Sequence, residues 1–265
     1  MRLPATLRWF LHGQPRYSAV TPWPAWLAVL TTVLILVSAQ ILAALAFPFI
    51  TGIDVTTVPA LRPGAASVDK LGPTATHAVL VILLLSQIGI IVMTLIAALR
   101  GGIGPVLQLN APEGGWSACL LALLMMIPLL AIFNGLAYLI APDKMAEDFR
   151  FFLDLARSDA RLPTTLAIGV GAPASEELLF RGFLLTALAA TRIGYWRSAI
   201  AATSAWTLLH WGYSWVGLLE VFLIGVYFSW LLWRTGSLWP LIFCHAVYNS
   251  GLLLALRAWP VTSGA

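Results

Sequence analysis

Charged residues are scarce in this sequence. Of its 265 residues, only 10% are Asp, Glu, Lys or Arg, whereas 60% are hydrophobic. Soluble domains carry about 25% charged residues, so the composition excludes an ordinary soluble protein and indicates an integral membrane protein. The net charge of +4 comes from scattered basic residues. It predicts attraction to anionic membrane lipids and no nucleic-acid partner.

Cysteine is nearly absent as well. Cys119 and Cys244 each stand alone in an apolar run. The chain also has no HExxH motif, the common histidine pair of zinc proteases. The sequence therefore predicts neither a disulfide framework nor a CxxC metal or redox site. Both cysteines are expected to pack as small apolar residues.

Long apolar runs fill most of the chain. A run of about 20 apolar residues can cross a bilayer as a helix, and short polar links join these runs. We therefore predict an all-α fold, a polytopic transmembrane bundle of about seven spans. The spans are expected at Trp26–Phe47, His77–Leu99, Ser117–Ala141, Thr164–Ala190, Ser198–Trp211, Val216–Trp233 and Leu238–Leu256.

The segment Pro142–Pro163 departs from this pattern. It carries nine charged residues, with Met145, Phe149, Phe152 and Leu153 at helical spacing. This spacing predicts an interfacial amphipathic helix, serving either as a lid or as a solvated connector. Residues 1–163 would then hold the N-terminal spans and this helix, and residues 164–256 a catalytic core, all within one membrane domain.

Three charged residues interrupt the apolar run from 164 to 190. Charges at membrane depth are costly and usually mark a functional site. Glu177 and Arg181 are four residues apart and share a helical face, which favours a structural ion pair. Glu176 lies about 100° round the helix and faces elsewhere, so it is the carboxylate left to act on a water or a ligand. The alternative is one buried polar knot that holds helices together.

Later spans add further polar groups. His210 follows Trp206 by four residues, and His245 and Asn249 are again four apart on one helical face. Such groups converge on a bundle interior because lipid does not solvate them.

Glu220 is another intramembrane acid, and Tyr227 follows it by about two turns on roughly the same face. Both are candidates to line a cavity with Trp206. A hydrogen bond from Glu220 to a neighbouring helix is the alternative. Asn134, in an earlier span, also suggests an interhelical hydrogen bond.

Three chemistries fit this set of residues. A carboxylate with imidazoles and an amide supplies a base, a proton carrier and an oxyanion donor, which together can drive water onto an amide carbonyl. The same groups could form a three-ligand zinc site from Glu176 or Glu177 with His210 and His245. A non-catalytic scaffold or transporter that relays protons is the third alternative.

Three motifs resemble those of a known family. EELLFRG at 176–182 is similar to the EExxxR motif of the CAAX protease and bacteriocin-processing (CPBP) family, which includes the type II CAAX prenyl proteases. WTLLH at 206–210 resembles its FxxxH motif, and HAVYN at 245–249 its HxxxN motif. The run from Phe222 to Leu238 is also similar, so the resemblance covers about residues 164–256. Trp206 departs from the usual Phe.

The resemblance implies a glutamate-dependent intramembrane protease without a required cofactor. Glu176 would activate water with the assistance of His210, while His245 and Asn249 would stabilise the oxyanion. Glu177 and Arg181 would hold the site together. The implied substrate is a peptide or protein, with or without a lipid, and the implied location is the bacterial inner membrane.

Overall fold

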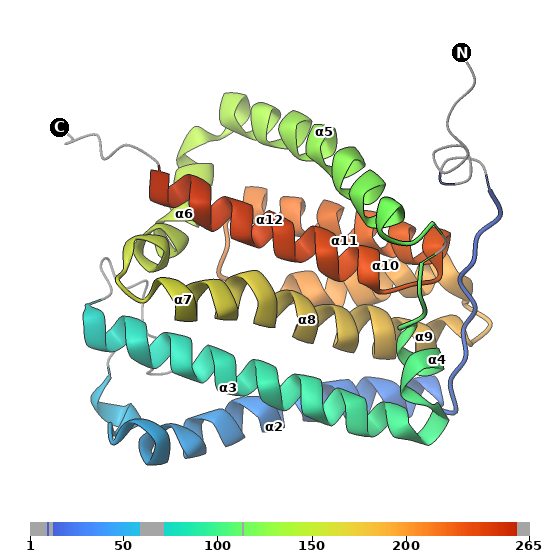
Figure 1. The fold of residues 1–265 in the computed structure, drawn as a ribbon, viewed down its shortest axis with the longest axis horizontal. Coiled ribbons are helices and arrows are strands. Elements are labelled where there is room, and N and C mark those ends of the chain that lie inside the picture. The colour runs from blue at the N-terminus through green and yellow to red at the C-terminus, as the bar shows by residue number, and fades with distance from the viewer. Residues whose placement is uncertain (1–9, 11–12, 59–71, 113, 259–265) are drawn as a thin grey trace.

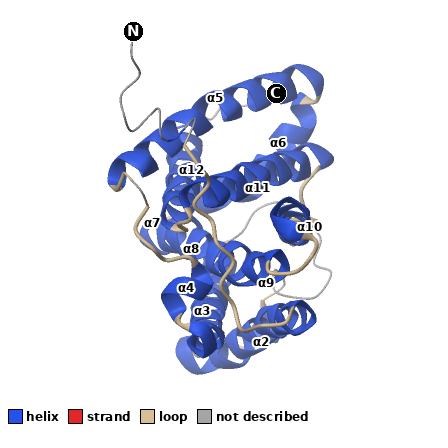
Figure 2. Ribbon diagram, turned by 90° about the vertical axis from the view of Figure 1, so that its right-hand side faces the viewer, coloured by secondary structure: helices blue, strands red, loops and turns tan. Residues whose placement is uncertain are grey.

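The computed structural model describes residues 10, 13–58, 72–112 and 114–258. All described elements are helices, which confirms the predicted all-α bundle, and Figure 2 draws no strand in this part of the chain. Part of the predicted N-terminal region, at residues 1–9, 11–12, 59–71 and 113, lies outside the described residues.

The first two long helices form an antiparallel pair along one side of the molecule (Figure 1). They are α2 (Ala25–Thr51) and α3 (Pro73–Ala98), with the short η1 (Val55–Thr57) after α2. In α2, Ala28, Ala39 and Ala43 are buried together with Ile35, while most of the large residues between them are exposed. A Cβ atom on Gly89 of α3 would lie 3.3 Å from the Cβ of Ala39. Small residues therefore let the two backbones approach closely.

Two helices follow on the opposite side of the bundle, after the short η3 (Leu99–Gly101) and α4 (Ile103–Leu107). They are α5 (Trp116–Ile140), which contains Pro128, and α6 (Pro142–Arg157). Phe149, Phe152 and Leu155 of α6 pack into a core cluster with α3 and α12. Most of the charged residues of this amphipathic helix are exposed, as its sequence pattern predicts, whereas Asp148 is half-buried.

A continuous helical run at residues 161–189 forms the middle of the bundle, between α3 and α12 (Figure 1). We call it the central helix. It alternates between α-helical and π-helical geometry in five consecutive elements: α7 (Arg161–Thr164), η4 (Thr165–Gly171), α8 (Ala172–Glu176), η5 (Glu177–Leu184) and α9 (Leu185–Ala189). Such π segments are rare and often occur at functional sites.

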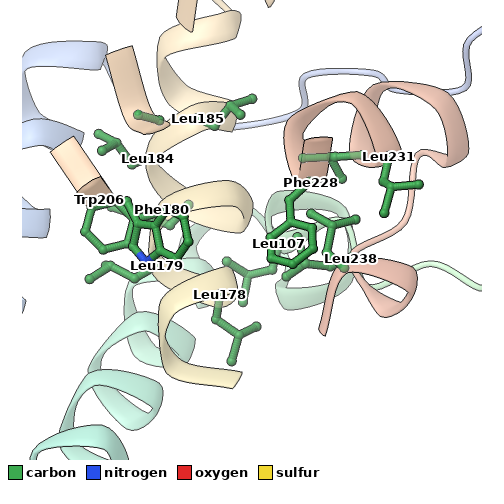
Figure 3. Close-up of a cluster of buried hydrophobic side chains, with 14 of the residues drawn as sticks. Leu107, Leu178, Leu179, Phe180, Leu184, Leu185, Trp206, Phe228, Leu231 and Leu238 are labelled. Carbon is green, nitrogen blue, oxygen red and sulfur yellow. The ribbon is translucent and has the colours of Figure 1, made fainter. Parts of the chain in front are cut away.

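The last three helices pack against the central helix. They are α10 (Gly194–Leu208), α11 (Trp215–Thr235) and α12 (Trp239–Ala258). Figure 3 shows Leu179 and Phe180 of the central helix among side chains that include Trp206 of α10 and Phe228 of α11. Every residue of η5 is buried, so both charged groups in this segment, Glu177 and Arg181, lie inside protein.

The number of long apolar helices is lower than the number of predicted spans. Within the described residues, five helices are long and apolar enough to cross a membrane: α2, α3 with η3, α5, α11 and α12. The two remaining predicted spans correspond to the central helix, which is divided by its π segments, and to α10. At 15 residues, α10 is shorter than the roughly 20 residues that a span requires.

Candidate active site

The first π segment of the central helix exposes two successive carbonyl groups to side chains. The N–H of Ala172 donates to the carbonyl of Ala167, five residues earlier. The next π-type bond would run from Pro173 to Ile168, but proline has no N–H. The carbonyl of Ile168 instead accepts a hydrogen bond at 2.9 Å from Nδ2 of Asn249 on α12. Asn249 thus replaces a missing backbone donor.

A second side-chain amide binds the same π segment from the other side. Nε2 of Gln87 on α3 donates to the carbonyl of Ala167 at 3.0 Å. Gln87 is 7% exposed, and a Cβ atom on Gly171 would collide with its Oε1 atom. The glycine therefore makes room for Gln87. Together, Gln87 and Asn249 fix the backbone that leads into Glu176.

Glu177 and Arg181 lie in the second π segment and form a fully buried ion pair. Nη1 of Arg181 is 3.3 Å from Oε1 of Glu177, and neither side chain is exposed. The guanidinium carbon also lies 4.1 Å from the centre of the Trp206 ring. The pair and this cation–π contact together offset the cost of burying the cation.

His245 is bound to the same carboxylate. Its Nδ1 atom lies 2.9 Å from Oε1 of Glu177. A carboxylate that is paired with Arg181 accepts hydrogen bonds, so Nδ1 of His245 carries the proton and donates it. The ring is thereby oriented with Nε2 on the side away from Glu177. Nε2 is a hydrogen-bond donor whenever the ring is an imidazolium.

Trp206 contacts polar residues of the site on several sides. Its indole Nε1–H donates to Oε2 of Glu176 at 2.6 Å. Its ring lies edge-on to both histidines, with centroid distances of 5.2 Å to His210 and 5.8 Å to His245. One aromatic side chain thus contacts the carboxylate, both imidazoles and, on its face, the guanidinium.

His210 lies in the turn that follows α10. Its Nδ1 atom is 3.1 Å from the carbonyl oxygen of Trp206, which can only accept. Nδ1 therefore carries the proton, and in the neutral ring Nε2 presents a lone pair. His210 is thus prepared to accept a proton or a hydrogen bond at Nε2.

These groups surround a cavity of about 250 Å³. All four predicted catalytic residues line it: Glu176, His210, His245 and Asn249. They come from three segments that are far apart in sequence but close in space: Glu176 from α8, His210 from the turn after α10, and His245 and Asn249 from successive turns of α12. The predicted cavity residues Trp206 and Glu220 also line it.

Two predicted positions differ from the structure. Tyr227 does not line this cavity, because its hydroxyl donates to the carbonyl of Ala122 on α5 at 2.5 Å. Glu176 is not entirely free, because one of its oxygens accepts from Trp206. Glu220 both lines the cavity and bonds a neighbouring helix, since its Oε1 accepts from Nδ2 of Asn134 at 2.8 Å.

Several cavity residues carry no motif signal in the sequence. Gln87 of α3 and Asp148 of α6 line the cavity from outside the segment that holds the three motifs, and Tyr213 and Tyr248 add two hydroxyl groups. Asp148 belongs to the amphipathic helix, where an acid ordinarily faces solvent. Its position beside a loop that is distant in sequence becomes visible only in the folded chain.

The described residues do not form a three-ligand metal site. Among them, no group of three or more His, Cys, Asp or Glu side chains comes together to hold a metal ion. The zinc alternative from the sequence therefore has no ligand set in this part of the chain.

Comparison with known proteins identifies the region that contains these residues. A family model described as "Type II CAAX prenyl endopeptidase Rce1-like" matches residues 158–251. Searches of the curated proteins and of the solved structures found no match. The family match confirms the resemblance seen in the three motifs. With its five long apolar helices, the protein is an integral membrane protein whose segment 158–251 is similar to the type II CAAX prenyl endopeptidases of the Rce1-like family.

Proposed function

We propose that this protein is an intramembrane endopeptidase in which Glu176 activates a water molecule for attack on a peptide carbonyl. The observation that carries the proposal is the cavity itself. It gathers the carboxylate of Glu176, the imidazoles of His210 and His245 and the carboxamide of Asn249 around a single space of about 250 Å³. These groups are the ones that hydrolysis of an amide requires.

Glu176 is the proposed general base. Trp206 holds its Oε2 atom at 2.6 Å, so the carboxylate has a defined orientation. Oε1 has no hydrogen-bond partner among the described residues and is available for a water. The water oxygen bonds to the carbonyl carbon while one of its protons passes to Glu176. Glu176 then gives that proton to the departing amine as the C–N bond breaks, so the base is regenerated.

His210 assists on the same side of the reaction. Its Nδ1–H is directed to the carbonyl of Trp206, which leaves the Nε2 lone pair to accept a hydrogen bond from the water. This second acceptor orients the water so that its own lone pair points at the substrate.

His245 and Asn249 are the proposed donors to the oxyanion. An imidazolium at His245, stabilised by Glu177 at 2.9 Å, donates from Nε2. The bond from Asn249 to Ile168 fixes which end of the carboxamide is the NH₂ group. The second N–H of that group is then available to the developing negative charge. Donors held in advance in this way stabilise the transition state more than the ground state.

The proposed substrate is a peptide or protein segment that reaches the cavity from the membrane. A second, apolar cavity of about 390 Å³ lies between α5 and α12 and shares Phe149, Tyr248 and Leu252 with the first. An apolar cavity of this kind suits a lipid chain attached to the substrate. We therefore extend the proposal to lipidated as well as unmodified peptides, cleaved in a bacterial inner membrane without a required cofactor.

A library of quenched fluorescent peptides, prenylated and unmodified, tests this function on detergent-purified protein. We expect wild type to cleave at least one member and Glu176→Gln to cleave none. The matched control is Glu147→Gln, because Glu147 is an exposed acid paired with Lys144 on α6. Loss of cleavage under chelation would favour the zinc enzyme instead. A folded Glu176→Gln protein that keeps its cellular role would favour the scaffold or transporter.

A further inference from the structure

The proposed catalytic cavity is strongly acidic. Three carboxyl groups line it, from Asp148, Glu176 and Glu220, and no Lys or Arg is among the described residues that do so. The guanidinium of Arg181, which lies over the ring of the cavity residue Trp206, is fully buried and already paired with Glu177. Glu176 has a proposed role in the reaction. Asp148 and Glu220 do not, although both are held in place by specific contacts.

Asp148 is fixed at the N-terminus of α11. Its Oδ1 accepts from the backbone N–H of Ser214 at 2.6 Å, and its Oδ2 accepts from the Ser214 hydroxyl at 2.6 Å. The N-terminal end of a helix favours a negative charge, so this position suits a carboxylate. A Cβ atom on Gly217 would lie 2.6 Å from Oδ2. The missing side chain at Gly217 thus lets the carboxylate lie directly against α11.

Glu220 is the cavity-lining acid of α11, three residues after Gly217. Nδ2 of Asn134 at 2.8 Å and the hydroxyl of Tyr248 at 3.2 Å both donate to its Oε1. Oε2 is left without a hydrogen-bond partner among the described residues. Gly217, which lies against Asp148, and Glu220 are three residues apart on α11, slightly less than one helical turn, and both line the cavity.

Tyr213 is a further polar group of this cavity. It lies in the loop between α10 and α11 and lines the same cavity. Burial raises the pKa of its phenol, and the charges of Glu176, Asp148 and Glu220 raise it further. All three acids are therefore close enough to act on one hydroxyl group.

We propose that Asp148 and Glu220 form a subsite for a Lys or Arg side chain of the substrate, close to the scissile bond. Two carboxyl groups that face one half-buried space repel each other, and a cation between them removes that repulsion. The described residues supply no third ligand for a metal ion at this place. A flexible ammonium or guanidinium group, with several N–H donors, matches two separated acids and the free Oε2.

This inference rests on the proposed peptidase function and names its substrate class. Peptides with a basic residue within two positions of the scissile bond are cleaved more efficiently than their neutral analogues. Peptides that place an acidic side chain or a free C-terminal carboxylate in the subsite are cleaved less efficiently. The preference for Lys over norleucine, which has almost the same shape without the charge, is at least about tenfold in kcat/KM, since partly buried charge pairs contribute that much or more.

The experiment compares matched peptides that carry Lys, norleucine or Glu at each position near the cleaved bond. Wild type is set beside Glu220→Gln, which keeps an acceptor for Asn134 and Tyr248 but loses the charge, and beside Asp148→Asn. The exposed control is Glu147→Gln. We expect the Lys preference to fall to about one-tenth or less in Glu220→Gln, with turnover of the norleucine peptide unchanged within about twofold, and to persist in Glu147→Gln.

A binding measurement separates this inference from the proposed function. The same Lys and norleucine peptides are titrated into Glu176→Gln protein, with and without Glu220→Gln, and followed by tryptophan fluorescence. Tighter binding of the Lys peptide that depends on Glu220 supports the subsite even if no peptide is ever cleaved. Glu176-dependent cleavage with equal rates for Lys and norleucine overturns the subsite and leaves the peptidase standing. Equal binding of both peptides also overturns it.

Discussion

Nδ1 of His245 lies 2.9 Å from Oε1 of Glu177, the same oxygen that Arg181 approaches at 3.3 Å. One buried carboxylate thus serves as counter-ion to the guanidinium and as the acceptor that orients the imidazole. The α12 helix is tied to the central helix through this atom. Structural and catalytic demands therefore meet at Glu177, although Glu177 does not line the cavity itself.

Single and double substitutions at Glu177 and Arg181 separate the structural role of Glu177 from its role in orienting His245. Arg181→Met alone leaves a buried carboxylate without its main counter-ion and should destabilise the protein by about 3–5 kcal/mol. Adding Glu177→Gln removes the uncompensated charge and should restore most of the stability. The double variant should nevertheless be inactive, because an imidazolium at His245 loses its anionic partner. Thermal unfolding in detergent and peptide hydrolysis measure the two effects, and an active double variant would contradict this account of His245.

Gly225 provides the space in which the Arg181 guanidinium lies. A Cβ atom there would be 2.6 Å from Nη2 of Arg181 and 2.6 Å from a methyl group of Thr203. Gly225→Ala should therefore displace Arg181, destabilise the protein by about 1–3 kcal/mol and lower peptidase activity. Gly135→Ala on α5 is the matched control, because nothing lies within 4 Å of its added methyl group. Equal stability of the two variants would show that the Arg181 packing adjusts freely.

The Ile168 carbonyl accepts a hydrogen bond from Asn249, and Pro173 cannot supply a backbone donor in its place. Asn249→Leu leaves the Ile168 carbonyl without a donor, since Pro173 has no N–H, and should cost about 1–3 kcal/mol of stability. Pro173→Ala in the same protein returns a backbone N–H five residues after Ile168 and should recover part of that loss. Activity should stay low in both variants, because the proposed oxyanion donor is still missing. If Pro173→Ala restores no stability to Asn249→Leu, the missing-donor account of η4 is wrong.

Trp206→Phe isolates the indole N–H from the aromatic ring. Phenylalanine keeps most of the wall beside His210 and His245 but removes the 2.6 Å hydrogen bond to Glu176. A hydrogen bond to a charged group contributes about 1.5–3 kcal/mol. We therefore expect kcat to fall by about tenfold or more with KM nearly unchanged. Trp211→Phe, at a residue 82% exposed, should leave both constants unchanged, and an equal effect of the two variants would refute a specific role for the Trp206 N–H.

The sequence predicts the helical class and much of the cavity, because both follow from rules that act along one helix. Helical register correctly separates the faces of Glu176 and Glu177, which have different partners in the structure. The high cost of charge in lipid correctly implies that polar groups on separate helices meet inside the bundle.

Features that depend on contacts between distant segments are not readable from periodicity. Glu220 and Tyr227 do share the face of α11 that contacts α5, as register suggests, but the cavity ends before Tyr227 is reached. The π segments require i to i+5 bonds and side-chain donors from α3 and α12, which no local pattern encodes. For the same reason Gln87 and Asp148, outside the motifs, are missed.

The most direct test of the central claim is the single-turnover rate of peptide cleavage by wild type and Glu176→Gln, each with and without a metal chelator. The glutamate mechanism predicts that the Gln variant folds normally and cleaves at least about 10²-fold more slowly, while the chelator changes neither rate. Cleavage by Glu176→Gln at the wild-type rate would contradict the assignment of Glu176 as the base that activates water.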